Sequence, residues 1–588
     1  MSSAVPRRVG VTDVAKGLVG FLPDLPLLAR EAPGLVLRKP SHTASIGLQF
    51  QRTAHRYADR AFLKGAGREL TYREANELVN QYAHLFGERG VGRGDVVGIN
   101  SANDVENVLV MLAVVKLGAV AGLINYNQRG EVLAHSLRTL DAALVVMADD
   151  LDEEFASSGE IATQQQVIHY SELPSLVQGR PADDPAVVNQ VRAKERALLI
   201  FTSGTTGMPK ASVMTHYRWL KSYSGLGALG VRLRPTDTLY CALPLYHNNA
   251  VTVALGAVLA AGAAMAVAPK FSASRFWDEC RTYDATAFVY IGELCRYLLA
   301  QPERSDDRDH NIRVIVGNGL RPDIWDQFQQ RFGIGRIAEF YGASECNIAF
   351  INAFNIGQTA GTCPLPYKVV AYDPETGAAT RDDAGRLATV KTGEVGLLIS
   401  KVTDRAPFDG YTDDAATEKK LLRNGFKDGD CWFDTGDLVR NQGLTHVAFV
   451  DRLGDTFRWK GENVATTEVE AALARAPQVA DSTVYGVDVP GCDGKAGMAA
   501  IVLADSETFD GAVLADHVRS ELPAHARPLF VRVVEALEHT STFKSRKVEL
   551  RDLGFAAGDE AVHVLTKDKG YVPAYDGYVD EIVAGTAG

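Results

Sequence analysis

The sequence has few cysteines, no excess of positive charge and no long apolar run free of helix or strand breakers. Its 7 cysteines are scattered through 588 residues, without the spacing of a zinc site or a redox pair. This usage favours reduced thiols and a cytoplasmic protein. Acidic residues outnumber basic ones by 73 to 61, for a net charge of −12. That balance argues against a dedicated nucleic-acid-binding protein, so we expect no nucleic-acid partner.

Membrane spans and targeting segments are also not indicated. Charged residues and prolines interrupt the apolar residues that follow the N-terminal MSSAVPRRVG. An uncharged stretch at residues 248–269 has about the length of a transmembrane helix, but it is rich in alanine and glycine. We predict a buried helix, a break at residues 261–263 and a strand at residues 264–268. The apolar segment Gly17–Ala29, broken by prolines, predicts an arm packed on the body, with contact to a membrane surface as the alternative.

Short apolar runs alternate with helical patterns through the first 450 residues. Helical spacing is clear in residues 75–86 and 105–117. The apolar runs are residues 96–99, 119–124, 142–147, 197–201, 285–291, 312–316 and 395–399. Continuous apolar runs indicate strands buried on both faces, and their alternation with helices indicates parallel pairing. We therefore predict a large α/β body with parallel-rich sheets flanked by helices.

The pattern changes after Asp451. Residues 464–474 and 513–522 predict helices, and residues 483–487, 498–503 and 530–534 predict strands. Composition and hydrophobicity match those of folded proteins throughout, with 46% hydrophobic and 23% charged residues. The C-terminal part is therefore predicted to be a small, separate α+β domain.

The sharpest motif is Thr202-Ser203-Gly204-Thr205-Thr206-Gly207-Met208-Pro209-Lys210, directly after an apolar strand. Its glycines permit close backbone approach, while its hydroxyls and terminal lysine are groups that wrap and neutralise a polyphosphate. It differs from the P-loop of nucleotide kinases, because Pro209 precedes the lysine and Ala211 follows it. We interpret residues 202–210 as a phosphate-binding loop with Lys210 as its cation.

At these residues the chain resembles the adenylate-forming superfamily of acyl-CoA synthetases, luciferases and peptide-synthetase adenylation domains. The resemblance runs in order from about Leu70 to Leu550. Its further blocks are Leu70–Glu74, Gly90–Asp95, Lys116–Ala119 with Asn125 and Arg129, Tyr341–Glu345, Thr435–Asp437, Arg452 and Gly461–Asn463. The resemblance implies a large domain at residues 1–453, which holds ATP and the acyl group, and a small mobile domain at residues 454–588.

The resemblance also implies an ATP site. Tyr341 would place its ring against adenine, Asp437 and Arg452 would bind the ribose hydroxyls, and Glu345 with Thr202 would bind Mg²⁺. The implied ATP-binding residues are Thr202, Ser203, Gly204, Thr205, Thr206, Gly207, Lys210, Gly317, Asn318, Gly319, Tyr341, Gly342, Ala343, Ser344, Glu345, Asp437, Arg452 and Lys544. ATP, Mg²⁺ and coenzyme A are therefore the expected cofactor and co-substrates.

The position of the mobile C-terminal lysine depends on how the family's late motif is aligned with this sequence. The family's late motif, Ser/Thr-Gly-Lys-x-x-Arg, corresponds here to residues 542–547, with Phe543 in place of glycine. Aligning Thr542 with the hydroxyl residue makes Lys544 the catalytic lysine, whereas a shifted match selects Lys547. We prefer Lys544. Gly454 stands at the expected hinge, where the family often carries Asp or Lys.

Two further groups of residues are implied by the resemblance. The acyl pocket would include Tyr246, His247, Tyr290 and Gly292, with His247 near the reacting carboxylate. The face toward coenzyme A would comprise Lys460, Gly461, Glu462 and Asn463. A core histidine in an apolar turn is the alternative reading of His247.

Residues 290–299, 317–323 and 451–464 resemble the branch of fatty acid transport proteins and very-long-chain acyl-CoA synthetases. The implied activity is an ATP-dependent ligation of a long or very long fatty acid to coenzyme A through an acyl-adenylate. Two alternatives stay open: a membrane-associated fatty-acid uptake or binding protein with little catalysis, and an adenylating ligase for another carboxylic acid. A peripheral membrane contact is compatible with each of them.

Overall fold

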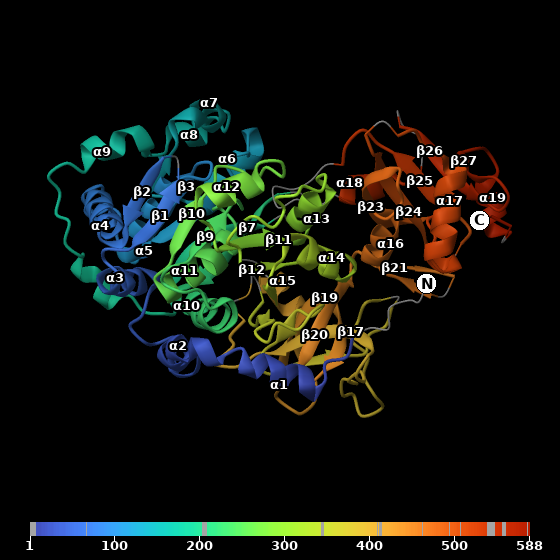
Figure 1. Cartoon of the computed structure of the whole chain (residues 1–588), viewed down its shortest axis with the longest axis horizontal. Helices are drawn as coiled ribbons and strands as arrows, with labels where there is room; N and C mark the ends of the chain where they lie inside the picture. Colours follow the sequence, from blue (N-terminus) through green and yellow to red (C-terminus); the bar gives the residue numbers. More distant parts are fainter. Residues whose placement is uncertain are drawn as a thin grey trace.

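The computed structural model describes residues 7–65, 67–202, 208–342, 346–374, 376–408, 410, 414–460, 462–492, 494–505, 507–537, 547–555, 560–584 and 586–587. A large sheet-rich body and a smaller C-terminal unit make up the chain, and the C-terminal unit lies to the right of the body in Figure 1. This is the mixed α/β architecture that the sequence predicts.

The first sheet of the body has six strands in the order β6-β5-β3-β4-β7-β8. Its strands are β3 (Val96–Asn100), β4 (Val120–Ile124), β5 (Leu144–Met147), β6 (Val167–His169), β7 (Arg196–Thr202) and β8 (Lys210–Thr215). All neighbouring strands are parallel except β7 and β8, which form an antiparallel pair. Every residue of β3, β4 and β5 is buried, as their continuous apolar runs predicted.

The second sheet joins a parallel half to an antiparallel half. Its order is β16-β17-β19-β20-β15-β14-β13-β12-β11-β9-β10-β1-β2, with β18 beside β19. The strands are β1 (Ala61–Gly65), β2 (Arg68–Thr71), β9 (Thr238–Cys241), β10 (Ala264–Val267), β11 (Ala287–Ile291), β12 (Val314–Asn318), β13 (Arg336–Tyr341), β14 (Phe350–Ile351), β15 (Gly361–Thr362), β16 (Tyr367–Val370), β17 (Val395–Lys401), β18 (Leu421–Arg423), β19 (Cys431–Gly443) and β20 (His446–Arg452).

The run at residues 395–399 is a strand, but the parallel pairing inferred for it is wrong. This strand, β17, pairs antiparallel with both β16 and β19. The described residues between β16 and β17 form no helix. Without a crossover helix the chain returns antiparallel to the strand before it.

Helices cover the faces of both sheets. They are α3 (Ile46–Arg56), α4 (Tyr72–Glu88), α5 (Val105–Lys116), α6 (Gly130–Leu140), α7 (Asp152–Ala156), α8 (Glu160–Thr163), α9 (Leu173–Leu176), α10 (His216–Ser222), α11 (Leu255–Ala261), α12 (Phe276–Thr282), α13 (Gly292–Ala300), α14 (Pro322–Phe332) and α15 (Asp414–Lys419), with 3₁₀ turns at η2 (Asp149–Leu151), η3 (Tyr170–Glu172) and η4 (Ala186–Gln190). A capping box starts α4, because Thr71 and Glu74 each accept a hydrogen bond from the backbone of the other.

Two π-helices, η5 (Tyr223–Val231) and η6 (Asn249–Ala254), lie within the body. The uncharged stretch at residues 248–269 forms η6, α11 and then β10, and its break is Gly262 with φ +74°. This confirms the predicted helix and strand. Within the part of the chain that the structure describes, no helix has both the length and the apolar character to cross a membrane.

The C-terminal unit has its own sheet and its own core. A five-stranded sheet runs β23-β24-β25-β26-β27 beside a β21-β22 hairpin. The elements are β21 (Phe457–Trp459), β22 (Glu462–Val464), β23 (Val479–Asp488), β24 (Lys495–Leu503), β25 (Phe530–Val533), β26 (Val562–Thr566), β27 (Gly570–Pro573), α16 (Thr466–Leu473), α17 (Gly511–Glu521), α18 (Lys547–Leu553), α19 (Tyr578–Val583) and η7 (Ala524–Ala526). The apolar cluster of this unit begins at Phe457. The domain boundary at residues 453 and 454 stays a prediction.

An N-terminal arm precedes the body. It consists of α1 (Val11–Val19), η1 (Leu22–Asp24) and α2 (Leu25–Leu37), which run along the lower edge of the molecule in Figure 1. The arm packs on the body, as the sequence predicted. Gly17 lies so close that an added Cβ would be 2.5 Å from Cβ of Phe354.

Candidate active site

The carboxyl ends of three parallel strands bring three predicted segments together. In the registers of β11, β12 and β13, Tyr290 lies opposite Gly317, and Gly317 lies opposite Glu339. Parallel strands end at one edge of a sheet, which is where such folds bind ligands. The turn Gly317–Gly319, the start of α13 at Gly292 and the end of β13 at Tyr341 therefore lie side by side.

Glycines permit close backbone approach at this edge. A Cβ added to Gly292 would be 1.8 Å from the carbonyl oxygen of Gly319, and one added to Gly317 would be 2.2 Å from that of Tyr290. Gly319 has φ +83°, which side-chain-bearing residues rarely adopt. No residue with a side chain can replace these glycines. The backbone N–H and C=O groups of the turn therefore lie close to the ends of the strands.

A buried carboxylate, which the sequence analysis did not single out, fixes this turn. The Glu339 carboxylate accepts hydrogen bonds from the backbone N–H groups of Gly319 (2.6 Å) and Leu320 (3.2 Å) and from the hydroxyl of Tyr290. Burial raises the pKa of Glu339 to about 8, against the opposing effect of the three donors. A lone carboxylate among the apolar residues that follow Arg336 in β13 was the signal that could have identified it.

The turn is also tied to a π-helix. The Asn249 side-chain amide, on η6, donates to the Asn318 side-chain oxygen at 2.7 Å. His247 lies just before this helix, half-buried, with its ring centroid 4.4 Å from that of Tyr246. Tyr246 is buried and meets Tyr126 edge-to-face at 5.8 Å. The predicted acyl residues Tyr246 and His247 therefore lie close in sequence to Asn249, which is bonded to the Gly317–Gly319 turn.

Tyr290 has a different setting from the other predicted acyl residues. Its side chain is fully buried, and its hydroxyl donates to Glu339. Its ring lies against Gly317, since an added Cβ there would be 2.6 Å from ring atoms of Tyr290. In this arrangement Tyr290 supports the turn from behind, and its place in an acyl pocket stays a prediction.

The predicted ribose residues meet on the antiparallel half of the sheet. The Tyr341 hydroxyl donates to the Asp437 carboxylate, and Asp437 lies opposite Arg452 in the register of β19 and β20. The Arg452 guanidinium lies 3.8 Å from that carboxylate and is more than half exposed. An aromatic ring, a buried carboxylate and an exposed cation therefore stand together, a donor and acceptor set suited to a nucleoside.

The phosphate loop connects the two strands of a hairpin. Thr202 ends β7 and pairs with Lys210, which begins β8 and is exposed. Residues 203–207 and 343–345, which include the predicted metal ligand Glu345, lie outside the described residues, as does the Thr202 side chain. The hairpin places Lys210 beside the end of β7, as a phosphate-binding role requires.

Charged residues join the C-terminal unit to the last strand of the body. The Lys547 ammonium donates to the Thr466 hydroxyl and pairs with Glu470, both at 2.9 Å. Thr466 in turn donates its backbone N–H (2.7 Å) and hydroxyl (3.1 Å) to Asp451 on β20. Burial lowers the pKa of Lys547, but Glu470, Asp455 and Asp451 outweigh it, so the pKa is raised overall. Lys547 is thus held at the junction between the C-terminal unit and β20.

Three of the remaining predicted residues, Gly454, Lys460 and Glu462, lie before or within the β21-β22 hairpin. Gly454 precedes this hairpin, and an added Cβ there would meet no atom within 4 Å. Lys460 stands at its turn with φ +50°, and Glu462 is exposed. Gly461, the Asn463 side chain and Lys544 lie outside the described residues.

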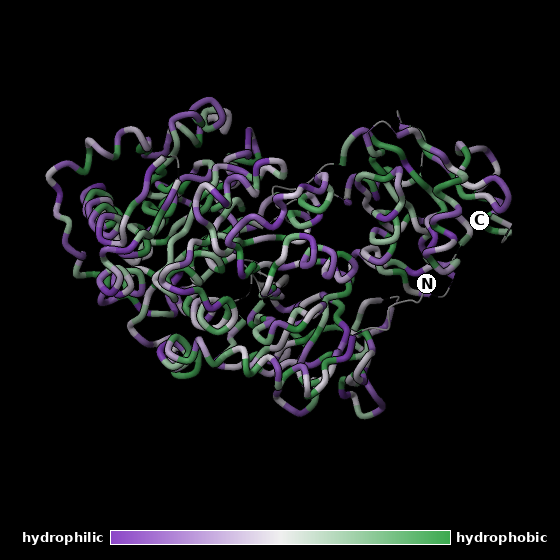
Figure 2. Tube along the Cα trace, viewed as in Figure 1, coloured by the Kyte–Doolittle hydropathy of each residue, from purple (hydrophilic) through white to green (hydrophobic). Residues whose placement is uncertain are grey.

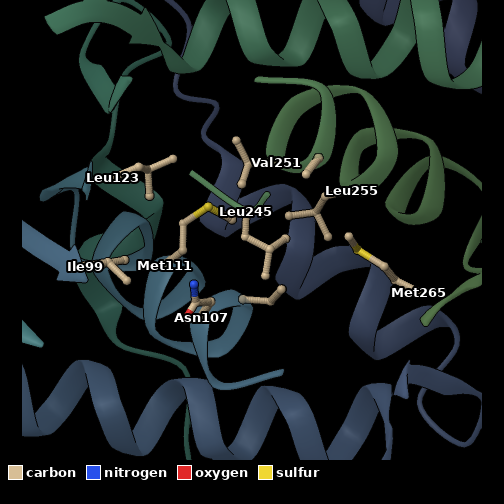
Figure 3. A pocket seen from close by; sticks show the side chains of 10 residues that line it. Ile99, Asn107, Met111, Leu123, Leu245, Val251, Leu255 and Met265 are labelled. Atoms are coloured by element: carbon tan, nitrogen blue, oxygen red, sulfur yellow. The ribbon is translucent and has the colours of Figure 1, made fainter. Parts of the chain in front are cut away.

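Leu245 is one of the residues that line a small apolar cavity. Figure 3 shows Met111, Leu123, Val251 and Leu255 converging on it from separate elements. The full lining is Ile99, Asn107, Val108, Met111, Leu123, Leu245, Ala250, Val251, Leu255 and Met265. Its free volume is about 10 Å³, no more than one water molecule needs. An acyl chain requires its lining to move.

Comparison with known proteins identifies the class. The chain matches the AMP-binding enzyme family over residues 50–402 and the AMP-binding enzyme C-terminal domain over residues 468–544. It therefore belongs to the family of AMP-binding enzymes.

Among its relatives is the medium/long-chain-fatty-acid–CoA ligase FadD6 of Mycobacterium tuberculosis, 54% identical over 98% of this chain and 97% of that protein. Long-chain fatty acid transport protein 6 of Mus musculus is 38% identical over 89% and 88%. The crystal structure of ATP-bound MatB from Rhodopseudomonas palustris has the same fold, with a TM-score of 0.72, 23% identity and coverage of 86% of this chain and 98% of that one.

Proposed function

We propose that this chain is an ATP-dependent fatty acid–CoA ligase, an acid–thiol ligase that forms an acyl-adenylate and releases AMP and pyrophosphate. The observation that carries the proposal is the group of Tyr341, Asp437 and Arg452, in which Tyr341 ends β13, the strand paired with β12 of the Gly317–Gly319 turn. A relative that is 54% identical over almost the whole chain and is named a medium/long-chain-fatty-acid–CoA ligase supports the substrate class.

The first half-reaction joins the acid to AMP. The fatty carboxylate attacks the α-phosphorus of ATP, the bond to the β-phosphate oxygen breaks, and pyrophosphate leaves. Charge collects on phosphate oxygens, so positioned cations supply most of the catalysis. Lys210 and the hydroxyl loop would hold the leaving phosphates, while Lys544 would bridge the carboxylate and the α-phosphate. Loss of one such cation should raise the barrier by about 3 kcal/mol.

The proposal includes Mg²⁺ because the predicted site offers the ligand atoms that this ion prefers. This ion prefers oxygen ligands, keeps several waters, and binds one or two protein oxygens together with substrate phosphates. Thr202, in the predicted phosphate loop, and Glu345, in the segment Tyr341–Glu345, carry such oxygens. When bound, the ion would neutralise phosphate charge.

The second half-reaction transfers the acyl group to coenzyme A. We infer that the C-terminal domain, residues 454–588, rotates about Gly454, withdraws Lys544 and presents residues 460–463 to the thiol. The thiol sulfur attacks the carbonyl of the mixed anhydride, and AMP leaves. The open surroundings of Gly454 and the single β-hairpin that follows it support a hinge there.

The acyl chain would extend from His247 past Leu245 into the apolar cavity. Its lining contains only aliphatic side chains, two methionines and Asn107, which suits a hydrocarbon tail. The small free volume implies that the π-helix η6 shifts as the chain enters. The proposal also includes a peripheral contact with a lipid surface, from which such an acid would be drawn; the cytoplasmic location expected from cysteine usage stays a prediction.

The deciding experiment is a pyrophosphate-release assay with Mg²⁺-ATP and acids from acetate to very-long-chain acids. We expect release to depend on both ATP and a medium or long acid, and coenzyme A to yield the matching thioester. Absence of AMP formation with every acid would overturn the proposal. Substantial fatty-acid binding without AMP formation would instead favour the uptake function that the names of the transport-protein relatives suggest.

A further inference from the structure

The N-terminal arm turns its apolar side chains outward. Of the fifteen large hydrophobic side chains that are exposed among the described residues, seven lie on α1, η1 and α2: Val11, Leu18, Val19, Leu22, Leu25, Val36 and Leu37, with exposures of 52–74%. A surface helix of a globular protein normally faces its apolar side inward. We call these seven residues the outer face.

Polar groups fix the inner side of the arm instead. Arg30 donates to the Tyr57 hydroxyl at 2.9 Å and to the Ala260 carbonyl, and Arg38 donates to the Leu220 carbonyl at 2.9 Å. The Lys221 ammonium donates to the Leu35 carbonyl. These contacts join α2 to the body, and Gly17 packs α1 against Phe354, so the apolar side chains that remain exposed point away from a fixed inner side.

The acids of the arm are all engaged. Asp13 accepts from the Gly10 backbone at 2.9 Å and pairs with Arg7, while Asp24 pairs with Arg232 at 3.4 Å. Glu31 is buried and accepts from Arg30. None of the three presents an unpaired carboxylate to the solvent beside the outer face.

The charge of this region is opposite to that of the chain. Residues 7–58 contain eight basic and three acidic residues, in a protein whose net charge is −12. Lys16 on α1 and Lys39, which follows α2 closely, are exposed, as is Arg52 on α3. An apolar face with basic residues along it matches the interface of an anionic bilayer, where apolar side chains enter the acyl boundary and cations meet headgroups.

The arm also adjoins the elements that line the apolar cavity. α2 packs on η5, where Leu35 lies 3.5 Å from the position of a Cβ at Gly225. η5 packs in turn on η6 and α11, whose Val251 and Leu255 line the cavity. Figure 1 shows α2 beneath α10 and α11, and Figure 2 shows hydrophobic stretches along α2.

From this arrangement we propose that the outer face of α1, η1 and α2 is the docking surface for an anionic lipid bilayer. The surface would hold the body where an amphiphilic acid is concentrated. The choice of a lipid occupant rests in part on the proposed fatty-acid substrate, but the docking itself needs neither ATP nor an acid.

Vesicle sedimentation with the full chain tests this surface. The probes are unilamellar vesicles of phosphatidylcholine, alone or with about 30% phosphatidylglycerol. The test variant is Leu18→Gln/Leu22→Gln/Leu37→Gln. The matched control is Val513→Gln/Leu553→Gln/Val583→Gln, because these C-terminal side chains are exposed to 52–55%. Thermal unfolding checks that both variants fold.

We expect the native chain and the control to bind anionic vesicles. The test variant should bind at least about tenfold more weakly, since it lacks three apolar side chains that would enter the bilayer. Lys16→Glu/Lys39→Glu should weaken binding to anionic vesicles and leave binding to pure phosphatidylcholine unchanged. No vesicle binding by the native chain, or equal binding by the test variant, would overturn the proposal. So would a native dimer, seen by sedimentation velocity, that the test variant abolishes without any vesicle binding by the native chain, because the occupant would then be a second copy.

Discussion

At the scale of single residues, the Glu339 carboxylate joins the Gly317–Gly319 turn to strand β13. It accepts from two backbone N–H groups of the turn and from Tyr290. Two of the turn's three residues are glycines, so Asn318 is the one residue in it with a side chain that can hold it, through Asn249. The turn's position therefore depends on Glu339 as well, a residue that touches no substrate.

Glu339→Gln should affect ATP binding more than turnover. Above pH 8, where Glu339 is ionised, the glutamine keeps the shape, but its amide nitrogen brings a donor into a site with three donors, and one contact is lost at a cost of about 1–3 kcal/mol. We expect the KM for ATP to rise several-fold and kcat to change little. A merely structural role would instead lower the folded fraction with KM unchanged, and circular dichroism alongside the kinetics distinguishes the two.

The same residue should make stability depend on pH. The pKa of Glu339 is about 8 in the folded chain and near 4.3 in an unfolded one, so the folded state retains a proton that the unfolded state has lost. Between these values stability falls as pH rises, by up to about 1.4 kcal/mol per pH unit. Urea unfolding at pH 5 and pH 8 should show a larger loss for the native chain than for Glu339→Gln.

His216 should act in the opposite direction at lower pH. It is fully buried, its Nδ1 accepts from the Ile46 N–H at 3.2 Å, and burial lowers its pKa to about 4. An unfolded histidine protonates near pH 6.5, so stability is lost as pH falls from 6.5 toward 4. His216→Asn keeps an acceptor for Ile46 and cannot protonate. Its unfolding free energy should change less over that range than that of the native chain.

At the scale of elements, the sequence predicted most of the α/β body but not its irregular helices. Buried strands such as β3 and β4 are readable because both faces are apolar. The π-helices η5 and η6 are not, because a wider helical turn leaves no periodic signature in uniformly apolar segments. The strand at residues 395–399 was found, but its direction depends on a missing crossover helix rather than on its own residues.

The site followed the same division. Motif residues Tyr341, Asp437 and Arg452 do meet, and each was predicted from a short pattern. Glu339 and Asn249 were missed, since a lone glutamate or asparagine carries no pattern and gains meaning only from the backbone that approaches it.

The π-helix η6 bears on chain length. Ala250, on η6, is fully buried at the edge of the apolar cavity. Ala250→Leu would fill the space that a long acyl tail needs, so kcat/KM for a long acid should fall at least tenfold relative to that for a medium acid. Met111→Leu, a volume-conserving change in the same lining, is the control and should leave the ratio nearly unchanged. An equal loss for both acids in Ala250→Leu would place the acyl tail elsewhere.

At the scale of the whole molecule, the proposed rotation requires two units to move past each other while remaining attached. Arg296 on α13 donates to the Ala480 carbonyl at 3.1 Å and pairs with Asp481 at 2.9 Å, which joins the body to β23. On the other side, Asp451 and Thr466 join β20 to α16. Arg475 of the C-terminal unit also lies 3.9 Å from Asp323 on α14. Polar contacts of this kind are suited to breaking and re-forming, as the proposed rotation between two half-reactions requires.

Substitutions of Lys544 and Lys547 should have clearly different effects, because we expect only Lys544 to act in the first half-reaction. Lys547 is paired with Glu470 and Thr466 inside the junction, so Lys547→Ala leaves the half-buried Glu470 carboxylate without its cation and should destabilise the C-terminal unit by about 2 kcal/mol. Lys544→Ala should leave the melting temperature near that of the native chain and abolish pyrophosphate release, while thioester formation from supplied acyl-adenylate continues. Calorimetry paired with the two half-reaction assays measures both effects. If Lys547→Ala instead stops adenylation without lowering stability, the mobile lysine is Lys547, and the motif is read three residues too early.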